Sequence, residues 1–115
     1  MLSKVNLREQ ADSLQTFFTY LKVGTLNSHV LHVLQGENRT LDFHIHDDSD
    51  ELFYVIEGAF QIETDDGLID LSEGDMIVIP KGTRHRPVCT SRVKCLLIET
   101  DGTLNKDNTG GAFYG

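Results

Sequence analysis

Residues 43–58 read FHIHDDSDELFYVIEG: two histidines one residue apart, an acidic segment, and a glutamate that opens an apolar run. Alternate residues of a β-strand point to the same face, so His44 and His46 can aim at one point. The acidic segment, residues 47–50, is typical of a turn, which lets Glu51 begin a second strand and aim back at that point. Two imidazoles and one carboxylate that converge in this way form a site for a divalent metal ion.

Length and charge limit the architecture and the partners of the chain. With 115 residues, we expect a single domain over residues 1–115. The net charge is −8 with only ten Lys and Arg residues, which predicts no nucleic-acid partner, because phosphate binding requires a basic surface. No apolar run is long enough to cross a membrane, and residues 1–10 lack the apolar centre of a signal peptide. The expected location is therefore the cytoplasm, with no membrane partner.

The two cysteines, Cys89 and Cys95, lie six residues apart. We expect two free thiols, with Cys95 packed as a small apolar side chain in a strand. A disulfide is the alternative, but a reducing compartment does not favour it.

An N-terminal arm, residues 1–23, is expected to contain one short helix. Asn6 and Glu9 have the spacing of a capping box, and apolar residues then recur at helical spacing, which predicts a helix near residues 7–14. Residues 17–23 are apolar and prone to β-structure. They predict an edge strand that covers one end of the core or pairs with a second subunit.

The rest of the chain reads as short strands, because turn signals recur about every ten residues with no amphipathic helix between them. This pattern predicts an all-β protein, an antiparallel sandwich or small barrel, with its core at about residues 24–99. Residues 100–115 are expected to form a loose C-terminal tail with Phe113 and Tyr114 as its only anchors. A turn is expected at residues 57–58 and a hairpin at residues 65–67. The expected strands are 30–35, 40–46, 52–56, 60–63, 68–71, 76–79, 83–88 and 93–99.

The strands around the candidate site look apolar on both faces. In the strand 52–56, the residues on the face of Glu51 and those on the opposite face are both apolar. In the strand 41–45, the residues that face away from His44 are apolar. A small barrel buries only its inner face, so the outer face requires a cover: the arm, a second sheet or another subunit. We therefore expect a homodimer. The expected barrel core, part of which would line a pocket, consists of Phe53, Val55, Phe60, Ile62, Met76 and Val78.

A further histidine completes the pattern. The motif G-x5-P-x-G-x2-H at residues 74–85 follows the motif H-x-H-x4-E-x6-G at residues 44–58. Together and in this order, the two motifs resemble the signature motifs of the cupin family over about residues 36–99, as in its small single-domain prokaryotic members. Two positions depart from that family. Gly36 lies eight residues before the first histidine where six are usual, and Cys89 stands where an asparagine usually ends the second motif.

The resemblance to cupins implies a jelly-roll β-barrel, or double-stranded β-helix, with one metal ion inside its mouth. The ligands that it implies by position are His44, His46, Glu51 and His85. Three imidazoles and one carboxylate suit Fe²⁺, Mn²⁺, Ni²⁺, Co²⁺, Cu²⁺ or Zn²⁺. Ca²⁺ and Mg²⁺ fit less well because they prefer shells made of oxygen.

Each implied ligand also has a simpler interpretation. His44 and His46 could be polar residues on a solvent-facing strand. Glu51 could be a surface carboxylate, with Asp50 as the ligand in its place. His85 lies between two arginines and could belong to an exposed basic strand. The matching intervals of all four residues favour metal binding over these alternatives.

Other polar residues near the motifs are expected to play smaller roles. The aspartates of residues 47–50 are expected to be solvated, and could also orient a ligand imidazole. Arg84 and Arg86 could attract an anionic substrate to the mouth of the barrel. His29 and His32 are expected to be ordinary strand residues, with His32 the candidate for a supporting role.

The predicted function is metal-dependent, with a small organic molecule as substrate or ligand. The first hypothesis is a mononuclear metalloenzyme, dioxygenase-like with Fe²⁺ or isomerase-like or lyase-like with another metal. The second is a non-catalytic module that binds or senses a small molecule through the metal, and the third is a structural zinc site. No further Glu, Tyr or His is clearly placed as a general acid or base, which favours chemistry borne by the metal itself and leaves the catalytic residues unassigned.

Overall fold

The computed structural model describes residues 2–104, 109 and 110, and within them nearly all regular structure is β-strand. One helix precedes the strands, and every strand pair in this part of the chain is antiparallel, which confirms the all-β prediction. No helix here is long and apolar enough to span a membrane. The elements are α1 (Leu7–Asp12), β1 (Leu21–Leu26), β2 (His29–Gly36), β3 (Arg39–Thr40), β4 (Glu51–Thr64), β5 (Gly67–Ser72), β6 (Met76–Ile79), β7 (His85–Cys89) and β8 (Val93–Thr100).

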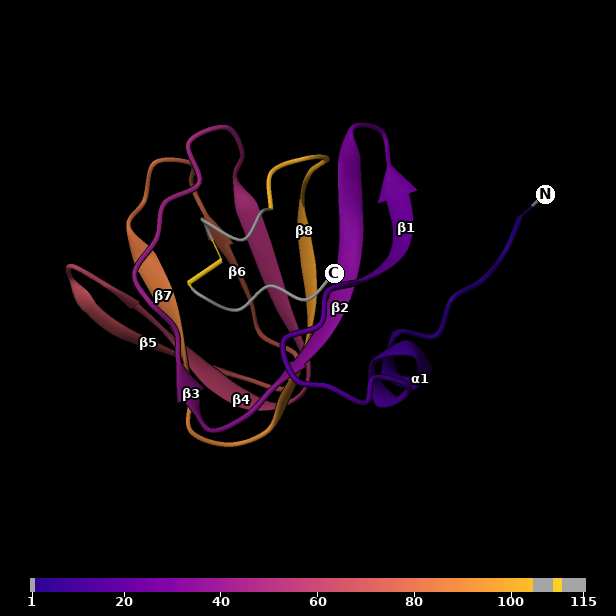
Figure 1. Cartoon of the computed structure of the whole chain (residues 1–115), viewed down its shortest axis with the longest axis horizontal. Helices are drawn as coiled ribbons and strands as arrows, with labels where there is room; N and C mark the ends of the chain where they lie inside the picture. Colours follow the sequence, from indigo (N-terminus) through magenta and orange to yellow (C-terminus); the bar gives the residue numbers. More distant parts are fainter. Residues whose placement is uncertain (1, 105–108, 111–115) are drawn as a thin grey trace.

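The strands form two layers that share the long strand β4 (Figure 1). The first half of β4 pairs with β8 and β6, and β8 continues through β2 to the edge strand β1. These strands and the first half of β4 form the first layer. The second half of β4 pairs with β5 and β7, and β7 pairs with β3, which together form the second layer. A register shift between Val55 and Glu57 and a φ of 84° at Gly58 mark the passage from one layer to the other. The predicted turn at residues 57–58 is therefore wrong, because Glu57 and Gly58 both pair with β8 after a bulge at Ile56, and the strand continues.

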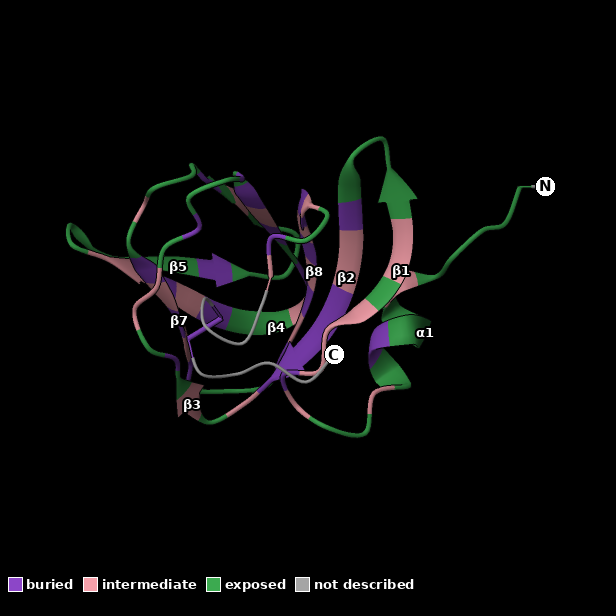
Figure 2. Ribbon diagram, turned by 45° about the horizontal axis from the view of Figure 1, so that its top comes forward, coloured by how far each residue is buried: buried purple, intermediate pink, exposed green. Residues whose placement is uncertain are grey.

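Strand register decides which residues enter the core between the layers. Met76 and Val78 were expected there but are exposed, by 57 % and 46 %. Ile77 pairs with the buried Phe53, so Ile77 and Ile79 share the inner face and their neighbours point outward. Figure 2 shows how burial varies along the fold, with most of β2 buried and most of β5 exposed. The other expected core residues are buried, as predicted: Phe53, Val55, Phe60 and Ile62.

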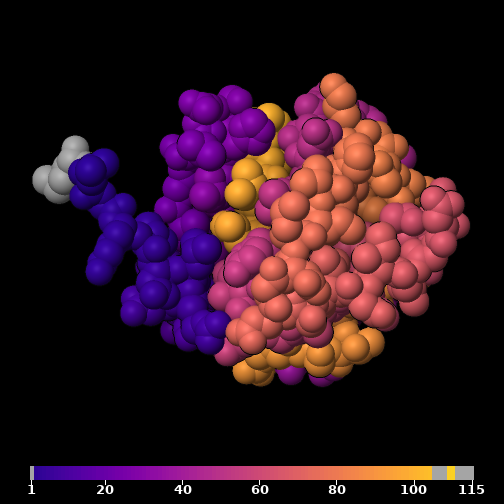
Figure 3. All heavy atoms as spheres, turned by 180° about the vertical axis from the view of Figure 1, so that it is seen from behind, coloured from indigo at the N-terminus to yellow at the C-terminus, as the bar shows by residue number. Residues whose placement is uncertain are grey.

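Helix α1 covers part of the outer face of the first layer. Its N-cap Asn6 accepts a hydrogen bond of 2.9 Å from the backbone N–H of Glu9, as the capping-box spacing predicts. Ala11 is buried against Val33 and Ile56 in a small cluster separate from the main core. The residues before the helix extend away from the body of the molecule (Figure 3).

The segment between α1 and β1 closes one side of the barrel. Phe18 is buried in the main core with a φ of 61°, and its backbone N–H donates to the carbonyl of Gln35 at 2.7 Å. A Cβ on Gly36 would lie 3.0 Å from the Phe18 ring, so the absence of a side chain there makes room for the ring. The edge strand predicted for residues 17–23 is confirmed only in part: β1 is an edge strand but begins at Leu21, and the residues before it cover the core instead.

The chain between β3 and the acidic turn is not the continuous strand predicted for residues 40–46. The strand β3 ends at Thr40, and only His44 forms a β-bridge, to His85. The backbone N–H of Asp42 instead donates to the carbonyl of Gly110 at 2.9 Å. The described part of the C-terminal tail is therefore packed against the barrel rather than loose. The expected anchors Phe113 and Tyr114 lie outside the described residues.

Candidate metal centre

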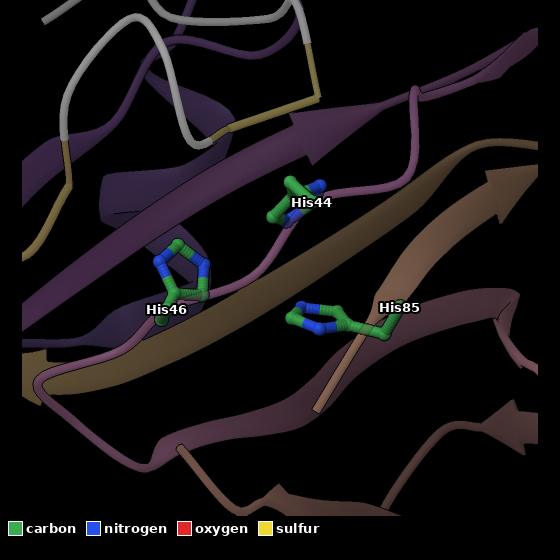
Figure 4. Close-up of side chains that lie close together, drawn as sticks. All are labelled: His44, His46 and His85. Carbon is green, nitrogen blue, oxygen red and sulfur yellow. The ribbon is translucent and has the colours of Figure 1, made fainter. Parts of the chain in front are cut away.

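Three of the four predicted ligands, His44, His46 and His85, converge inside the barrel. Each offers one ring nitrogen, and these three nitrogens lie within 4.8 Å of one another. Figure 4 shows His44 and His46 on one segment, with His85 reaching toward them from the start of β7. His46 is 3 % exposed and His85 is fully buried, so the solvent-facing interpretations of these two histidines are wrong.

Glu51 lies beside the three histidines. Its Oε1 is 3.1 Å from Nε2 of His85, and its Oε2 is 3.0 Å from Nε2 of His46. Asp50, the alternative carboxylate, is exposed, and its Oδ1 accepts a hydrogen bond from the backbone N–H of Lys81. Of these two carboxylates, Glu51 is the one in contact with the histidines.

Two backbone carbonyls orient the imidazoles. Nδ1 of His44 lies 2.8 Å from the carbonyl of Asp42, and Nδ1 of His85 lies 2.8 Å from the carbonyl of Thr83. A carbonyl can only accept, so Nδ1 carries the proton, and in the neutral ring Nε2 presents its lone pair. This support was expected from the aspartates of residues 47–50, whose carboxylates make no such contact in the described structure.

The donor set fits a divalent cation. In the neutral tautomer of His85, Nε2 is an acceptor and so is the carboxylate of Glu51, so a proton or a cation must lie between them. Both ring nitrogens of His46 are buried without a hydrogen-bond partner, because the contact with Glu51 is not aligned for one. Unsatisfied buried groups of this kind cost about 1–3 kcal/mol each. A metal ion bound to one of the two nitrogens would remove that cost for this atom.

The electrostatics of the cluster favour a charged carboxylate among the imidazoles. Burial alone would raise the pKa of Glu51, but its contacts with His46 and His85 outweigh burial and lower the pKa to about 2. Burial lowers the pKa of His44, which favours the neutral ring that can bind a metal. Burial also opposes the charged form of His85, but hydrogen bonds to Glu51 and to the Thr83 carbonyl outweigh burial and raise its pKa. A divalent cation competes with that proton for the same nitrogen.

An apolar cavity adjoins the cluster. Its free volume is small, about 30 Å³, and His44, His46 and Glu51 contribute to its wall. Aromatic and aliphatic side chains supply most of the remainder, among them Phe18 and Phe60. This wall provides an apolar contact surface next to the place where a metal ion would bind.

Both cysteines also face this cavity, as buried free thiols, which confirms the predicted absence of a disulfide. Burial raises the pKa of Cys89 to about 11 and raises that of Cys95 further. The thiols are therefore uncharged and contribute apolar surface.

Two polar residues near the site were not predicted from the sequence. Tyr20 lines the cavity, and burial, together with the charges of Glu51 and Glu99, raises its pKa so that it stays protonated. Glu99 is buried on the inner face of β8 and contacts His32, the supporting candidate. The signal for Glu99 was the alternation of β8, in which Glu99 shares the face of three apolar residues: Val93, Cys95 and Leu97.

The family model described as "Cupin domain" matches residues 29–100, which include all four candidate ligands. The chain is a cupin. Over 97 residues this cupin is 36 % identical to the uncharacterised protein YdbB of Bacillus subtilis, covering 82 % of the chain and 83 % of that relative. A solved structure, of a cupin-2 domain-containing protein from Shewanella frigidimarina, superposes with a TM-score of 0.80 at 30 % identity, covering 84 % of this chain and 93 % of the other.

A named enzyme is similar to part of the cupin. The 3-hydroxyanthranilate 3,4-dioxygenase of Bacillus thuringiensis is 38 % identical over 72 residues, which is 58 % of this chain. The matched region spans only 40 % of that dioxygenase. The predicted cupin barrel is thus confirmed, and so is a histidine cluster that is able to hold one metal ion.

Proposed function

We propose that this cupin binds one divalent transition metal through His44, His46, His85 and Glu51, and uses it in a dioxygenase-like reaction on a small organic molecule. The observation that carries the proposal is the buried His46, whose two ring nitrogens lack hydrogen-bond partners beside two oriented imidazoles. The partial similarity to a protein named as a dioxygenase favours this chemistry over an isomerase-like or lyase-like step.

The residues of the site have separate roles in this proposal. The bound ion would supply Lewis acidity and, if it is Fe²⁺, electrons for a reaction with dioxygen. Three neutral imidazoles and the carboxylate of Glu51 would leave a divalent ion with a net charge of +1, which attracts an anionic oxygen of the substrate. The apolar wall around Phe18 and Phe60 would hold the body of the substrate and exclude water.

Dioxygen uptake is the direct test of this function. Protein purified without a nickel column and loaded anaerobically with Fe²⁺ is expected to consume dioxygen with at least one member of a panel of small phenols, thiols and keto acids. The same protein loaded with Zn²⁺ should consume none, because zinc has no accessible redox chemistry. Oxygen-electrode traces together with elemental analysis give the result. Full iron occupancy without uptake over the whole panel would contradict the enzyme and favour a binding module.

We also propose that the cupin forms a homodimer through the outer face of its first layer. Tyr54, Met76 and Val78 are exposed there, on paired positions of β4 and β6. Helix α1 covers a different part of this face, around Val33 and Ile56. Adjacent exposed apolar residues of this kind are typical of an interface between subunits.

Substituting Met76→Glu should weaken the dimer, because a charge would be buried without a partner. Light scattering at micromolar concentration is expected to show a dimer for the unmodified protein and a monomer for this variant. Leu68→Glu, on the exposed strand β5, is the control and should remain dimeric. A monomeric unmodified protein would refute the proposal.

A further inference from the structure

A second, polar cavity lies beside the metal cavity. Tyr20 and Leu104 belong to the walls of both. The polar cavity has a free volume of about 170 Å³ and is also lined by His32, Glu99 and Asp101. Neither Lys nor Arg is present among the described residues that line it. Its charge is therefore negative, and it is unsuited to a carboxylate or a phosphate.

Glu99 is the residue in this cavity that the packing of the barrel does not explain. It is 1 % exposed, and it follows Ile98, which pairs with Leu52, so it lies next to Glu51 on the neighbouring strand. Its Oε1 lies 3.1 Å from Nδ1 of His32, whereas its Oε2 is buried without a hydrogen-bond partner. Buried carboxylate oxygens normally have a donor, so one is missing here.

The chemistry of the cavity selects the kind of donor. In the ionised carboxylate of Glu99, Oε2 only accepts, and a positive group bound there would stabilise this ionised form. The aromatic ring of Tyr20, in the wall of the same cavity, provides a surface that attracts cations. An ammonium group meets all three conditions, whereas a neutral hydroxyl meets only the first.

We propose that this polar cavity is the recognition subsite for a primary ammonium group of the substrate, held by Glu99 and oriented through His32, while the oxygen-bearing end of the same molecule reaches the metal. This inference rests on the proposed function, because it assumes that the substrate is bound at the histidine cluster. It assigns the substrate to the class of small amines that also carry a metal-binding oxygen.

Two catechols that differ in their side chains test this subsite. Protein loaded with Zn²⁺ is titrated under argon, by calorimetry, with dopamine and with 4-methylcatechol. Both probes offer two oxygens to the metal, but only dopamine carries an ammonium. The unmodified protein is expected to bind dopamine at least about tenfold more tightly, as a charge-assisted hydrogen bond to a buried carboxylate implies.

Glu99→Gln should bring this affinity ratio close to one, with the zinc content and the affinity for 4-methylcatechol unchanged. Asp101→Asn is the matched control, because it removes the same charge from an exposed position of the same cavity. It should change the ratio by less than about threefold, since exposed charges are screened. His32→Ala should lower the ratio partly, because the carboxylate keeps its charge but loses its orientation.

Several results would overturn the subsite. Equal affinities of the two catechols for the unmodified protein, no dopamine binding at full zinc occupancy, or a ratio that Glu99→Gln leaves intact would each do so without affecting the metal centre. A purely structural His32–Glu99 pair predicts the last of these results, together with a lower melting temperature. If the unmodified protein binds no zinc, the metal centre fails instead. The subsite is then tested by the ratio of the affinities for tyramine and for 4-methylphenol, which should likewise fall close to one in Glu99→Gln.

Discussion

Replacing His46 with alanine is expected to lower the affinity for a divalent transition metal by more than about 100-fold, because the loss of a direct ligand exceeds the ~10–100-fold effect of losing an outer partner. His46 is buried, and its ring nitrogens have no other partner that would compensate for the loss of the metal. His85→Ala should have a similar effect, because it removes a second buried imidazole of the cluster. Competition titration with a coloured chelator and elemental analysis of the purified variants measure both changes.

His29→Ala provides the control, because His29 is an exposed histidine at the start of β2 and lies outside the cluster. It should bind metal as the unmodified protein does. Glu51→Gln tests the fourth ligand, and its affinity should also fall, because a neutral amide replaces a carboxylate whose pKa is about 2. Unchanged affinity in this variant would remove Glu51 from the ligand set and leave the three histidines. Full metal content in both histidine variants would show that the metal binds elsewhere.

Substituting Gly58→Ala is expected to lower the free energy of unfolding by about 2–5 kcal/mol, the sum of a left-handed backbone penalty and of overpacking. Gly58 has a φ of 84°, and a Cβ there would lie 2.2 Å from the backbone carbonyl oxygen of Arg92. That oxygen belongs to the backbone, so it cannot move aside as a flexible side chain could. Urea denaturation followed by circular dichroism measures the change.

Gly24→Ala is the matched control for this prediction. Gly24 also lies in a strand, β1, but a Cβ there would meet no atom within 4 Å, and its φ is not positive. Its free energy of unfolding should change by less than about 1 kcal/mol, and an increase is the expected direction, because alanine restricts the unfolded chain. Equal stability of the two variants would mean that the left-handed backbone at Gly58 is not needed to carry β4 between the layers.

The sequence was sufficient to predict the candidate centre because its residues stand at fixed intervals from turns. His44, His46 and Glu51 flank an acidic turn, and His85 follows a Pro-Gly turn, so local rules place each near a strand end. The fold class was predicted from the same kind of signal, the turns that recur between short strands. The structure then brings together residues that are about 40 positions apart, as two motifs in order had predicted.

What could not be predicted depends on pairing between distant strands. The dipeptide at residues 57–58 is compatible with a turn and with a continuous strand. It is the pairing of Gly58 with Val93 that keeps β4 continuous. The residues of β6 are all apolar, so no alternation reveals that Met76 faces outward. Glu99 resembles any charged residue at a strand end until His32, 67 positions away, is placed beside it.

The segment that carries Phe18 and Tyr20 lies before residue 29, outside the region matched to the cupin family, whereas the three histidines lie inside it. Part of the cavity wall is thus encoded outside the family's region, although most of the wall and all the candidate ligands lie within it. Exchange of residues 16–20 between relatives is therefore expected to change which molecules bind, while the metal ion and its affinity stay the same.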